Sequence, residues 1–313
     1  MTQTRVIIDT DPGIDDAMAI LYLAAHPEVK IEALTTVFGN SDVLTTARNA
    51  AYLVTHFTLD VPVFVGAAEP IVRPRHISQL KVHGADAFGD THLAATQALP
   101  AMDVPACDAI IAAVRASPGA ITLLALGPLT NLAMALQKAP DIACHVAGVV
   151  CMGGAFGNQN RSGNIRPHAE ANIFYDPEAA ERVCAADWPV TMIGLDVTLD
   201  CILPAPDAAQ MAEMGHSAAR FLYDISRGYE ALYIKRDGAL GCCLHDVVAA
   251  VYLTRPELFD LERAAIRVKT SGQYDGQTKL LHQAPAQPIQ AMAKKVSASS
   301  LLEDYKRHIF SFD

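Results

Sequence analysis

Short, almost continuous apolar segments alternate with amphipathic ones along the first two thirds of the chain. The apolar segments are rich in β-branched residues and predict strands at 5–9, 31–37, 61–66, 121–126, 146–152 and 189–195. Between them, apolar residues recur with helical spacing at 15–26, 42–57, 106–117, 128–139 and 177–187. Strands that are apolar on both faces and alternate with helices indicate an α/β fold: a doubly wound, mostly parallel central sheet flanked by helices.

The last third of the chain is predicted to be more helical. We expect one or two helices at 206–234, a strongly apolar helix at about 239–253, a strand at 264–270 and a final helix at 298–308. The sequence contains no internal repeat and no low-complexity linker, so residues 1–313 are interpreted as one domain. Two stretches, 67–92 and 153–172, lack periodicity and are rich in Gly, Asn, His and Pro, which makes them candidate active-site loops.

The composition narrows the kinds of partner that the protein can bind. The formal net charge is −10, and nothing in the sequence suggests the basic face that grips polymeric nucleic acid. No apolar run approaches the roughly 20 residues of a membrane span, and no signal peptide is evident. The seven cysteines form no CxxC motif and mostly lie in apolar runs, which favours reduced core residues. We therefore expect a cytoplasmic protein that acts on a small molecule, with no nucleic-acid or membrane partner.

Polar residues follow the predicted strands at five places, namely 9–16, 38–40, 126–131, 152–154 and 194–196. Ligands of doubly wound sheets bind at the carboxyl ends of the strands, so we expect these five segments to meet at one site. The first segment alone contributes several carboxylates. The predicted edge is therefore acidic.

The acidic segment after the first strand is the strongest chemical signal. Asp9, Asp11, Asp15 and Asp16 lie within eight residues, at a turn from strand to helix. Carboxylates packed this closely repel one another unless some are protonated or a cation neutralises them, and a hard divalent cation prefers such oxygen ligands. The alternative is helix capping, in which first-turn acids interact favourably with the helix dipole. Capping explains one or two of the acids but not all four, so we favour a metal site.

Two further segments carry candidate chemistry. His245 and Asp246 interrupt a strongly apolar stretch, where burying titratable groups without partners is costly. A core histidine with a capping aspartate is an equally good explanation in isolation. Beside an acidic metal site, Asp246 becomes a candidate distal ligand and His245 a candidate acid. In the second segment, 163–172, Asn164, Glu170 and Asn172 offer groups suited to sugar hydroxyls, although composition alone favours a solvated loop there.

At this point the sequence resembles a known family. The segment DTDPGIDDA (9–17) is similar to the signature of the inosine–uridine-preferring nucleoside hydrolases. The resemblance continues in order and spacing through TTVFGN (35–40), VHG (82–84), LGPLTN (126–131), VVCMGG (149–154), AEANI (169–173), DPEAA (176–180), VTMIGLDVT (190–198) and LHD (244–246). The resemblance implies hydrolysis of the bond between ribose and base in ribonucleosides, through a sugar with oxocarbenium character.

The resemblance also implies roles for individual residues. It makes Asp11 both a Ca²⁺ ligand and the base that takes a proton from the attacking water, with Asp16, Asp246 and the backbone carbonyl of Leu126 as further ligands. It makes His245 the proton donor to the leaving base. The implied substrate-binding residues are Asp15, Asn40, Asn164, Glu170 and Asn172 for the ribose, together with Met152, His83 on a mobile loop, and Tyr229 and Tyr233 on a second mobile segment. A homo-oligomer, either a tetramer or a dimer, is implied as well.

Two departures from the family pattern bear on substrate preference. Ala171 stands where an aromatic residue is common, and the loop at 153–163 is a few residues longer. Tyr229 and Tyr233 favour an inosine–uridine-like preference, with a pyrimidine-specific enzyme as the alternative. A non-catalytic nucleoside or ribose sensor is a second alternative, although Asp11 and Asp246 are both retained. A Mg²⁺-dependent phosphohydrolase is disfavoured because the sequence has no glycine-rich phosphate loop and no basic clamp.

Overall fold

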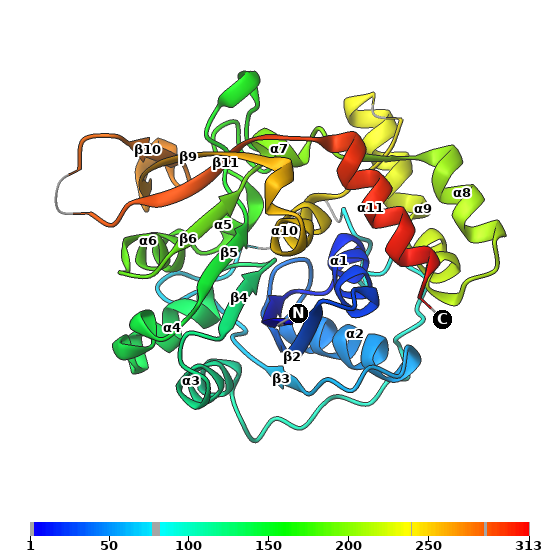
Figure 1. Ribbon diagram of the computed structural model, residues 1–313, viewed down its shortest axis with the longest axis horizontal. Helices are drawn as coiled ribbons and strands as arrows, with labels where there is room; N and C mark the ends of the chain where they lie inside the picture. The colour runs from blue at the N-terminus through cyan, green and yellow to red at the C-terminus, as the bar shows by residue number, and fades with distance from the viewer. Residues whose placement is uncertain (1–2, 77–81, 239, 285–286, 313) are drawn as a thin grey trace.

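The computed structural model describes residues 3–312 apart from 77–81, 239 and 285–286. Its centre is a large, mostly parallel sheet (Figure 1). The strands of this sheet are β1 (Thr4–Thr10), β2 (Val29–Thr36), β3 (Val63–Val65), β4 (Ile121–Ala125), β5 (Gly148–Met152), β6 (Val190–Ile193), β9 (Phe259–Val268), β10 (Thr278–Leu281) and β11 (Gln290–Val296). Their order across the sheet is β10–β9–β11–β6–β5–β4–β1–β2–β3. Strand β9 is antiparallel to both of its neighbours, and the other pairings are parallel.

Helices cover both faces of this sheet. They are α1 (Ile14–Ala25), α2 (Val43–His56), α3 (Ala106–Ala116), α4 (Thr130–Lys138), α5 (Ala171–Tyr175), α6 (Pro177–Ala185), α7 (Leu195–Thr198), α8 (Ala205–Glu213), α9 (Ser217–Asp237), α10 (His245–Thr254) and α11 (Ala298–Phe310). None of the helices that can be described is long and apolar enough to cross a membrane.

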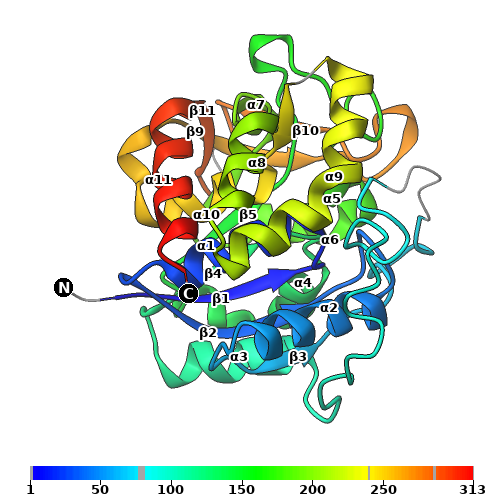
Figure 2. The ribbon, with the colours of Figure 1, turned by 90° about the vertical axis from the view of Figure 1, so that its right-hand side faces the viewer.

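Two hydrophobic cores lie on opposite faces of the sheet. Successive residues of a strand point to opposite faces, so Val6 and Ile8 of β1 join one core while Ile7 joins the other. The first core is completed by α1, α9, α10 and α11, and the second by α3, α4 and α6. Figure 2 shows α9 and α11 on the same side of β1. Burial on both faces explains why these strands are apolar throughout, and it confirms the predicted fold class.

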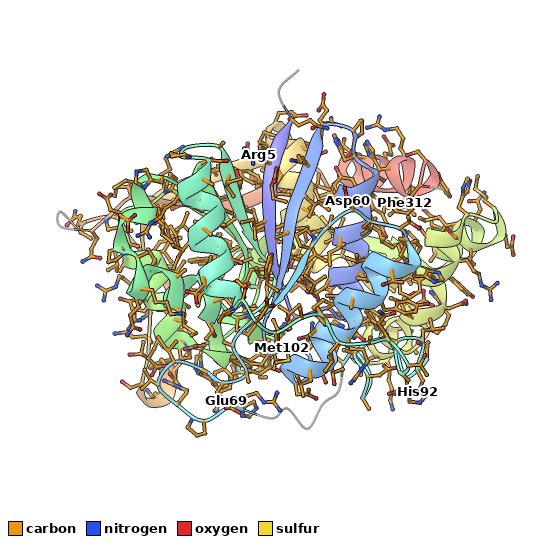
Figure 3. The ribbon with its side chains drawn as sticks, turned by 90° about the horizontal axis from the view of Figure 1, so that it is seen from below. Arg5, Asp60, Glu69, His92, Met102 and Phe312 are labelled. Carbon is orange, nitrogen blue, oxygen red and sulfur yellow. The ribbon has the colours of Figure 1, made fainter. Side chains whose placement is uncertain are left out.

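The carboxyl ends of the parallel strands define the edge at which the site forms. Figure 3 shows Arg5, near the start of β1, at one end of the sheet, and Glu69 and His92 at the other end. Both of these residues belong to the long segment between β3 and α3, which contains the first predicted active-site loop. The two described ends of that loop, marked by Glu69 and His92, therefore lie at the carboxyl edge, and its residues 77–81 are outside the described part of the chain.

The last third of the chain differs from the prediction in its strands. The apolar run expected to be a helix from about 239 is instead strand β8 (Gly241–Cys243), and α10 begins only at His245. Strand β8 pairs with β7 (Ile202–Pro204), and a short apolar run does not reveal by itself whether it pairs as a strand or coils. The sequence pattern predicts neither β10 nor β11, and β9 is longer than the expected 264–270. The stretch 206–234 forms two helices, α8 and α9, which confirms one of the two stated options.

The cysteines are free thiols. Six are buried, as the sequence indicates, whereas Cys144 is exposed.

Candidate active site

A pocket of about 410 Å³ opens at the carboxyl edge of the sheet. The predicted site residues that line it are Asp15, Asn40, His83, Leu126, Met152, Asn164, Glu170, Asn172, Tyr229, Tyr233, His245 and Asp246. The other two, Asp11 and Asp16, adjoin the pocket through Asn40. The Asn40 backbone N–H donates to Asp11 Oδ2 over 2.6 Å, and its side-chain amide donates to Asp16 Oδ2 over 3.0 Å. The fold thus brings every predicted site residue to one place.

The turn from β1 into α1 builds the acidic floor of the pocket. Gly13 caps the helix, and the backbone N–H of Gly13 donates to Asp16 Oδ2 over 3.0 Å. The Thr10 hydroxyl donates to Asp16 Oδ1 over 2.5 Å. Asp16 is thus both the capping residue that the sequence allows and a member of the acidic cluster. Helix capping and metal binding, the two explanations of these acids, are therefore compatible.

Carboxylates that are distant in the sequence meet at this floor. Oxygens of Asp15, Asp16 and Asp246 lie within 4.8 Å of one another, and all three side chains are buried. Asp11 is buried beside them, and its Oδ1 has no hydrogen-bond partner within the described residues. Asp246 comes from the first turn of α10, so its arrival depends on the packing of α10 against α1.

Burial and crowding raise the pKa of each carboxyl in this cluster. Burial raises the pKa of Asp11 well above its usual range, and the charge of Asp16 raises it further. Burial and then the charges of Asp15 and Asp16 do the same to the pKa of Asp246. Burial and the charge of Asp16 raise the pKa of Asp15 to about 8. A divalent cation would relieve this repulsion, because it neutralises oxygens that otherwise have to hold protons.

The donor set fits a hard metal ion. Carboxylate oxygens and a backbone carbonyl are the ligands that such ions prefer, and the unpartnered Oδ1 of Asp11 supplies one more oxygen. The trio of carboxylates within 4.8 Å of one another contains Asp15, which the family resemblance assigns to the ribose, while the backbone N–H of Asp11 donates to Asp16 Oδ1 over 3.3 Å. The Leu126 carbonyl accepts a hydrogen bond of 2.6 Å from the Asn172 amide. The predicted carboxylate ligands therefore lie together, and Leu126 lines the same pocket as Asp246.

The segment around α5 forms a second wall of the pocket. Glu170 caps α5, and its carboxylate accepts hydrogen bonds from the backbone N–H groups of Asn172, Gly154 and Ile173. Asn164 Oδ1 accepts from the backbone N–H of Ala171 over 3.0 Å. These hydrogen bonds to the backbone hold the polar side chains in place along the wall, where Glu170 is buried and Asn164 is exposed.

Four rings form an aromatic row along the remaining wall: His83, Tyr229, Tyr233 and His245. Neighbouring ring centroids are 5.2, 4.8 and 6.0 Å apart in that order. The Tyr233 hydroxyl lies 2.8 Å from His245 Nε2, and the Thr198 hydroxyl lies 2.8 Å from His245 Nδ1. His245 is therefore a buried histidine with both ring nitrogens bonded, and it faces the pocket at the same time.

His83 closes the row near the start of α1. Its Nδ1 accepts the backbone N–H of Ile14 over 3.1 Å. Burial, with a smaller contribution from the proximity of His245, lowers the pKa of His83 to about 3, so its ring is neutral at physiological pH. This contact needs Gly13, because a Cβ there would lie 2.7 Å from His83 Nδ1.

Some residues of the pocket were not predicted, and one predicted segment does not reach it. Arg75 and His76 line the pocket from the first candidate loop, and Tyr175 lines it from α5. The loop composition indicated the region but not these positions. At the end of β6, Asp196 accepts hydrogen bonds from the backbone N–H groups of Phe156 and Asn158, and it does not line the pocket.

Comparison with known proteins decides which family this site belongs to. The family model for "inosine-uridine preferring nucleoside hydrolase" matches residues 6–303. The chain belongs to this family. Members are N-glycosidases of nucleosides, so the chain is a ribonucleoside hydrolase.

Individual nucleoside hydrolases resemble the chain over most of its length. Uridine nucleosidase 1 of Arabidopsis thaliana is 38% identical over 88% of this chain and 81% of its own length. The non-specific ribonucleoside hydrolase RihC of Salmonella agona is also 38% identical, over 88% of this chain and 87% of its own. The solved structure of a plant nucleoside hydrolase, PpNRh1, superposes with a TM-score of 0.92 at 32% identity and covers 98% of this chain and 99% of that one.

Proposed function

We propose that this nucleoside hydrolase uses Ca²⁺ to cleave ribonucleosides into ribose and free base, with inosine- and uridine-like substrates favoured. The observation that carries the proposal is the meeting of two features in one pocket. A buried cluster of carboxylates forms its floor, and an aromatic row that ends in His245 forms a wall. The floor suits a sugar and a cation, and the row suits a planar base.

The residues proposed to hold the ion are Asp11, Asp16, Asp246 and the carbonyl of Leu126, with Asp15 close enough to take part. When bound, the ion supplies positive charge that orients the ribose diol and acidifies a water molecule. Calcium is favoured over smaller ions because the site offers several oxygens and can accept more from the sugar.

The protein side chains would then carry out three tasks. Asp11, whose Oδ1 is unpartnered among the described atoms, takes the proton of the attacking water. Asp15, Asn40, Asn164, Glu170 and Asn172 hold the ribose hydroxyls, and the carboxylates among them stabilise the positive charge that develops on the sugar. His245 protonates the base as it leaves.

The preference for the base is inferred from the aromatic row. Tyr229 and Tyr233 are both buried and offer ring faces along the wall where a base would lie. A pyrimidine-specific enzyme is the second candidate, because one of the similar proteins is a uridine nucleosidase. The partner in either case is a small-molecule ribonucleoside.

The test is a reducing-sugar assay with the common ribonucleosides, in Ca²⁺ and again after EDTA. We expect release of ribose from inosine and uridine, loss of activity in EDTA and recovery on adding Ca²⁺. We also expect 2′-deoxyinosine to have a kcat/KM lower by several orders of magnitude, because the lost hydroxyl leaves buried polar groups unpaired. Equal kcat/KM for inosine and 2′-deoxyinosine would contradict the proposed grip on the diol. A protein that binds inosine without releasing ribose would instead be a sensor.

A further inference from the structure

Thr198, one of the hydrogen-bonding partners of His245, has no part in the reaction proposed above. The Nε2 of His245 lies 2.8 Å from the hydroxyl of Tyr233, which lines the pocket, while its Nδ1 lies 2.8 Å from Oγ1 of Thr198, which does not line it. Thr198 ends helix α7, which packs against α10. The contact thus joins two helices that are distant in sequence, at the residue proposed to protonate the base.

The chemistry of an imidazole makes the partner at Nδ1 decisive. A histidine that gives the proton on Nε2 to a leaving base becomes a neutral ring with its hydrogen on Nδ1. That form needs a hydrogen-bond acceptor at Nδ1, because an unpaired N–H in a buried site is costly. Thr198 Oγ1 lies 2.8 Å from Nδ1, and a hydroxyl oxygen at that distance can accept this hydrogen bond. The same contact also suits the charged ring, whose two nitrogens both carry hydrogens.

We propose that Thr198 is a positioning residue: its hydroxyl accepts the Nδ1–H of His245 and so keeps Nε2 directed at the leaving base. The inference rests on the proposed function, since it assigns a supporting role for the same reaction. In that reaction the electrons of the ribose–base bond pass to the base, which takes the Nε2 proton of His245. Water supplies the hydroxyl to the sugar and its proton to Asp11, so the neutral ring keeps the Nδ1–H that Thr198 accepts.

Thr198 is held firmly enough for this task. Its side chain is fully buried. Its backbone N–H donates to the Gly194 carbonyl over 3.1 Å, and its own carbonyl accepts from the Cys201 N–H over 3.1 Å. Gly194 in turn lies so close to the Gly154 carbonyl that a Cβ would approach it to 2.8 Å. A β-branched side chain on a fixed backbone has few rotamers, so the hydroxyl has little freedom to leave Nδ1.

The decisive variant is Thr198→Val, which keeps the shape of the side chain and removes the hydroxyl. We expect its kcat on inosine and uridine to fall by about 10- to 100-fold with KM changed less than about threefold, within the range of a proton-transfer contribution. The activity on p-nitrophenyl riboside should change little, because its leaving group needs no proton. Thr198→Ser restores the hydroxyl and should recover most of the lost kcat.

The matched control is Thr36→Val. Thr36 is also a fully buried threonine, but its hydroxyl has no partner within the part of the chain that the structure describes. This variant should hydrolyse all three substrates at the wild-type rate. It separates the loss of a particular hydrogen bond from the general effect of replacing a buried threonine.

Several outcomes would overturn the inference. One is an unchanged kcat of Thr198→Val on inosine and uridine. Another is an equal loss on p-nitrophenyl riboside, which would mark a purely structural role. If Thr198→Val fails to fold, ¹⁵N spectra of the wild-type histidines provide the test, with the His245 signals assigned by their loss in His245→Gln. We expect hydrogen on Nδ1 in the neutral ring, and hydrogen on Nε2 alone would refute the role of Thr198. If the wild-type protein cleaves no ribonucleoside, the proposed function fails first.

Discussion

At the scale of single residues, two glycines determine where the Asp11 carboxylate lies. A Cβ on Gly39 would come within 2.0 Å of Asp11 Oδ2, and a Cβ on Gly127 within 2.4 Å of Asp11 Oδ1. The carboxylate therefore occupies the space that a side chain would take on either side of it. Since neither glycine has a positive φ, close approach and not backbone conformation requires glycine at these positions.

We predict that Gly127→Ala displaces the Asp11 carboxylate and disables the enzyme. A shift of about 1 Å in a reacting group can cost on the order of 100-fold in rate, so we expect kcat to fall at least that far. Asp11→Ala sets the lower limit of activity, and Gly127→Ala should approach it. Calcium affinity, measured by titration calorimetry, should fall in parallel.

Gly148→Ala is the matched control for this substitution. A Cβ on Gly148, at the start of β5, would meet nothing closer than 3.9 Å. This variant should keep wild-type kcat and calcium affinity. Wild-type turnover by Gly127→Ala would show that the Asp11 carboxylate tolerates displacement, which contradicts the role proposed for it.

The sequence predicts the chemical groups of this site better than it predicts the residues that hold those groups in position. The carboxylates at 9–16 are adjacent in sequence, so their conflict of charge is evident without a structure. Gly39, Gly127 and Thr198 act through residues that are distant in sequence. Nothing local distinguishes a glycine that makes room for a carboxylate from one that ends a strand.

At the scale of elements, a buried polar cluster fastens α11 to α1. The Tyr22 hydroxyl of α1 donates to Asp304 Oδ2 over 2.7 Å, and Arg255 donates to Asp304 Oδ1 over 2.9 Å. The rings of His26 and His308 stack with centroids 4.3 Å apart. Helix α1 also carries the acids of the pocket floor and packs against α10. The cluster thus stabilises the helix group that brings the two acidic segments together.

We predict that Asp304→Asn destabilises the protein in a pH-dependent way. Burial raises the pKa of Asp304, but the Tyr22 hydroxyl and the charges of His308 and Arg307 outweigh it and hold the pKa below its usual value. A lowered pKa adds stability above the unfolded value of about 3.9, and that stability is lost as the pH falls through the folded value. Urea unfolding at pH 7 should show a loss of about 1–3 kcal/mol.

The difference between wild type and Asp304→Asn should shrink as the pH falls from about 4 to about 3, because the unfolded chain then takes up a proton that the folded wild-type carboxyl binds less readily. Asp141→Asn is the control. Asp141 pairs with Arg115 on the surface, where water screens the two charges, so this variant should change the free energy of unfolding little at either pH. A loss for Asp304→Asn that is equal at pH 7 and pH 3 would show that its charge contributes nothing.

The elements themselves were predictable where the pattern is local and strong. The strands from β1 to β6 alternate with long helices, and their apolar runs reflect burial on both faces. Strand β11 was missed because two lysines interrupt its apolar pattern, and its place depends on pairing with β6 and β9. The apolar residues of strand β8 continue almost directly into α10, so the sequence pattern predicts one helix over both segments. In both segments, pairing with strands that are distant in sequence determines the structure.

At the scale of the whole molecule, part of the negative charge is buried. The formal net charge is −10, yet Asp9, Asp11, Asp15, Asp16 and Asp246 all lie inside the fold. Burial raises the pKa of Asp9 to about 7 and, with the charge of Asp16, that of Asp15 to about 8. The folded state therefore holds protons that the unfolded chain releases above its ordinary aspartate pKa of about 3.9. Folding without a cation becomes less favourable as the pH rises from about 4 to about 8.

We predict that the Tm of the protein in EDTA falls between pH 6 and pH 8, and that Ca²⁺ raises it most at pH 8. An ion at about 100 times its Kd adds about 2.7 kcal/mol, which corresponds to a rise in Tm of about 5 °C. Asp246→Asn removes one charge from the cluster, so it should flatten the fall in EDTA and reduce the calcium shift. Asp103→Asn, at an exposed position away from the pocket, should change neither. A Tm in EDTA that is constant from pH 6 to pH 8 would mean that the pKa values of these carboxyls are not raised in the folded protein. The electrostatic reason for placing a cation among them would then be lost.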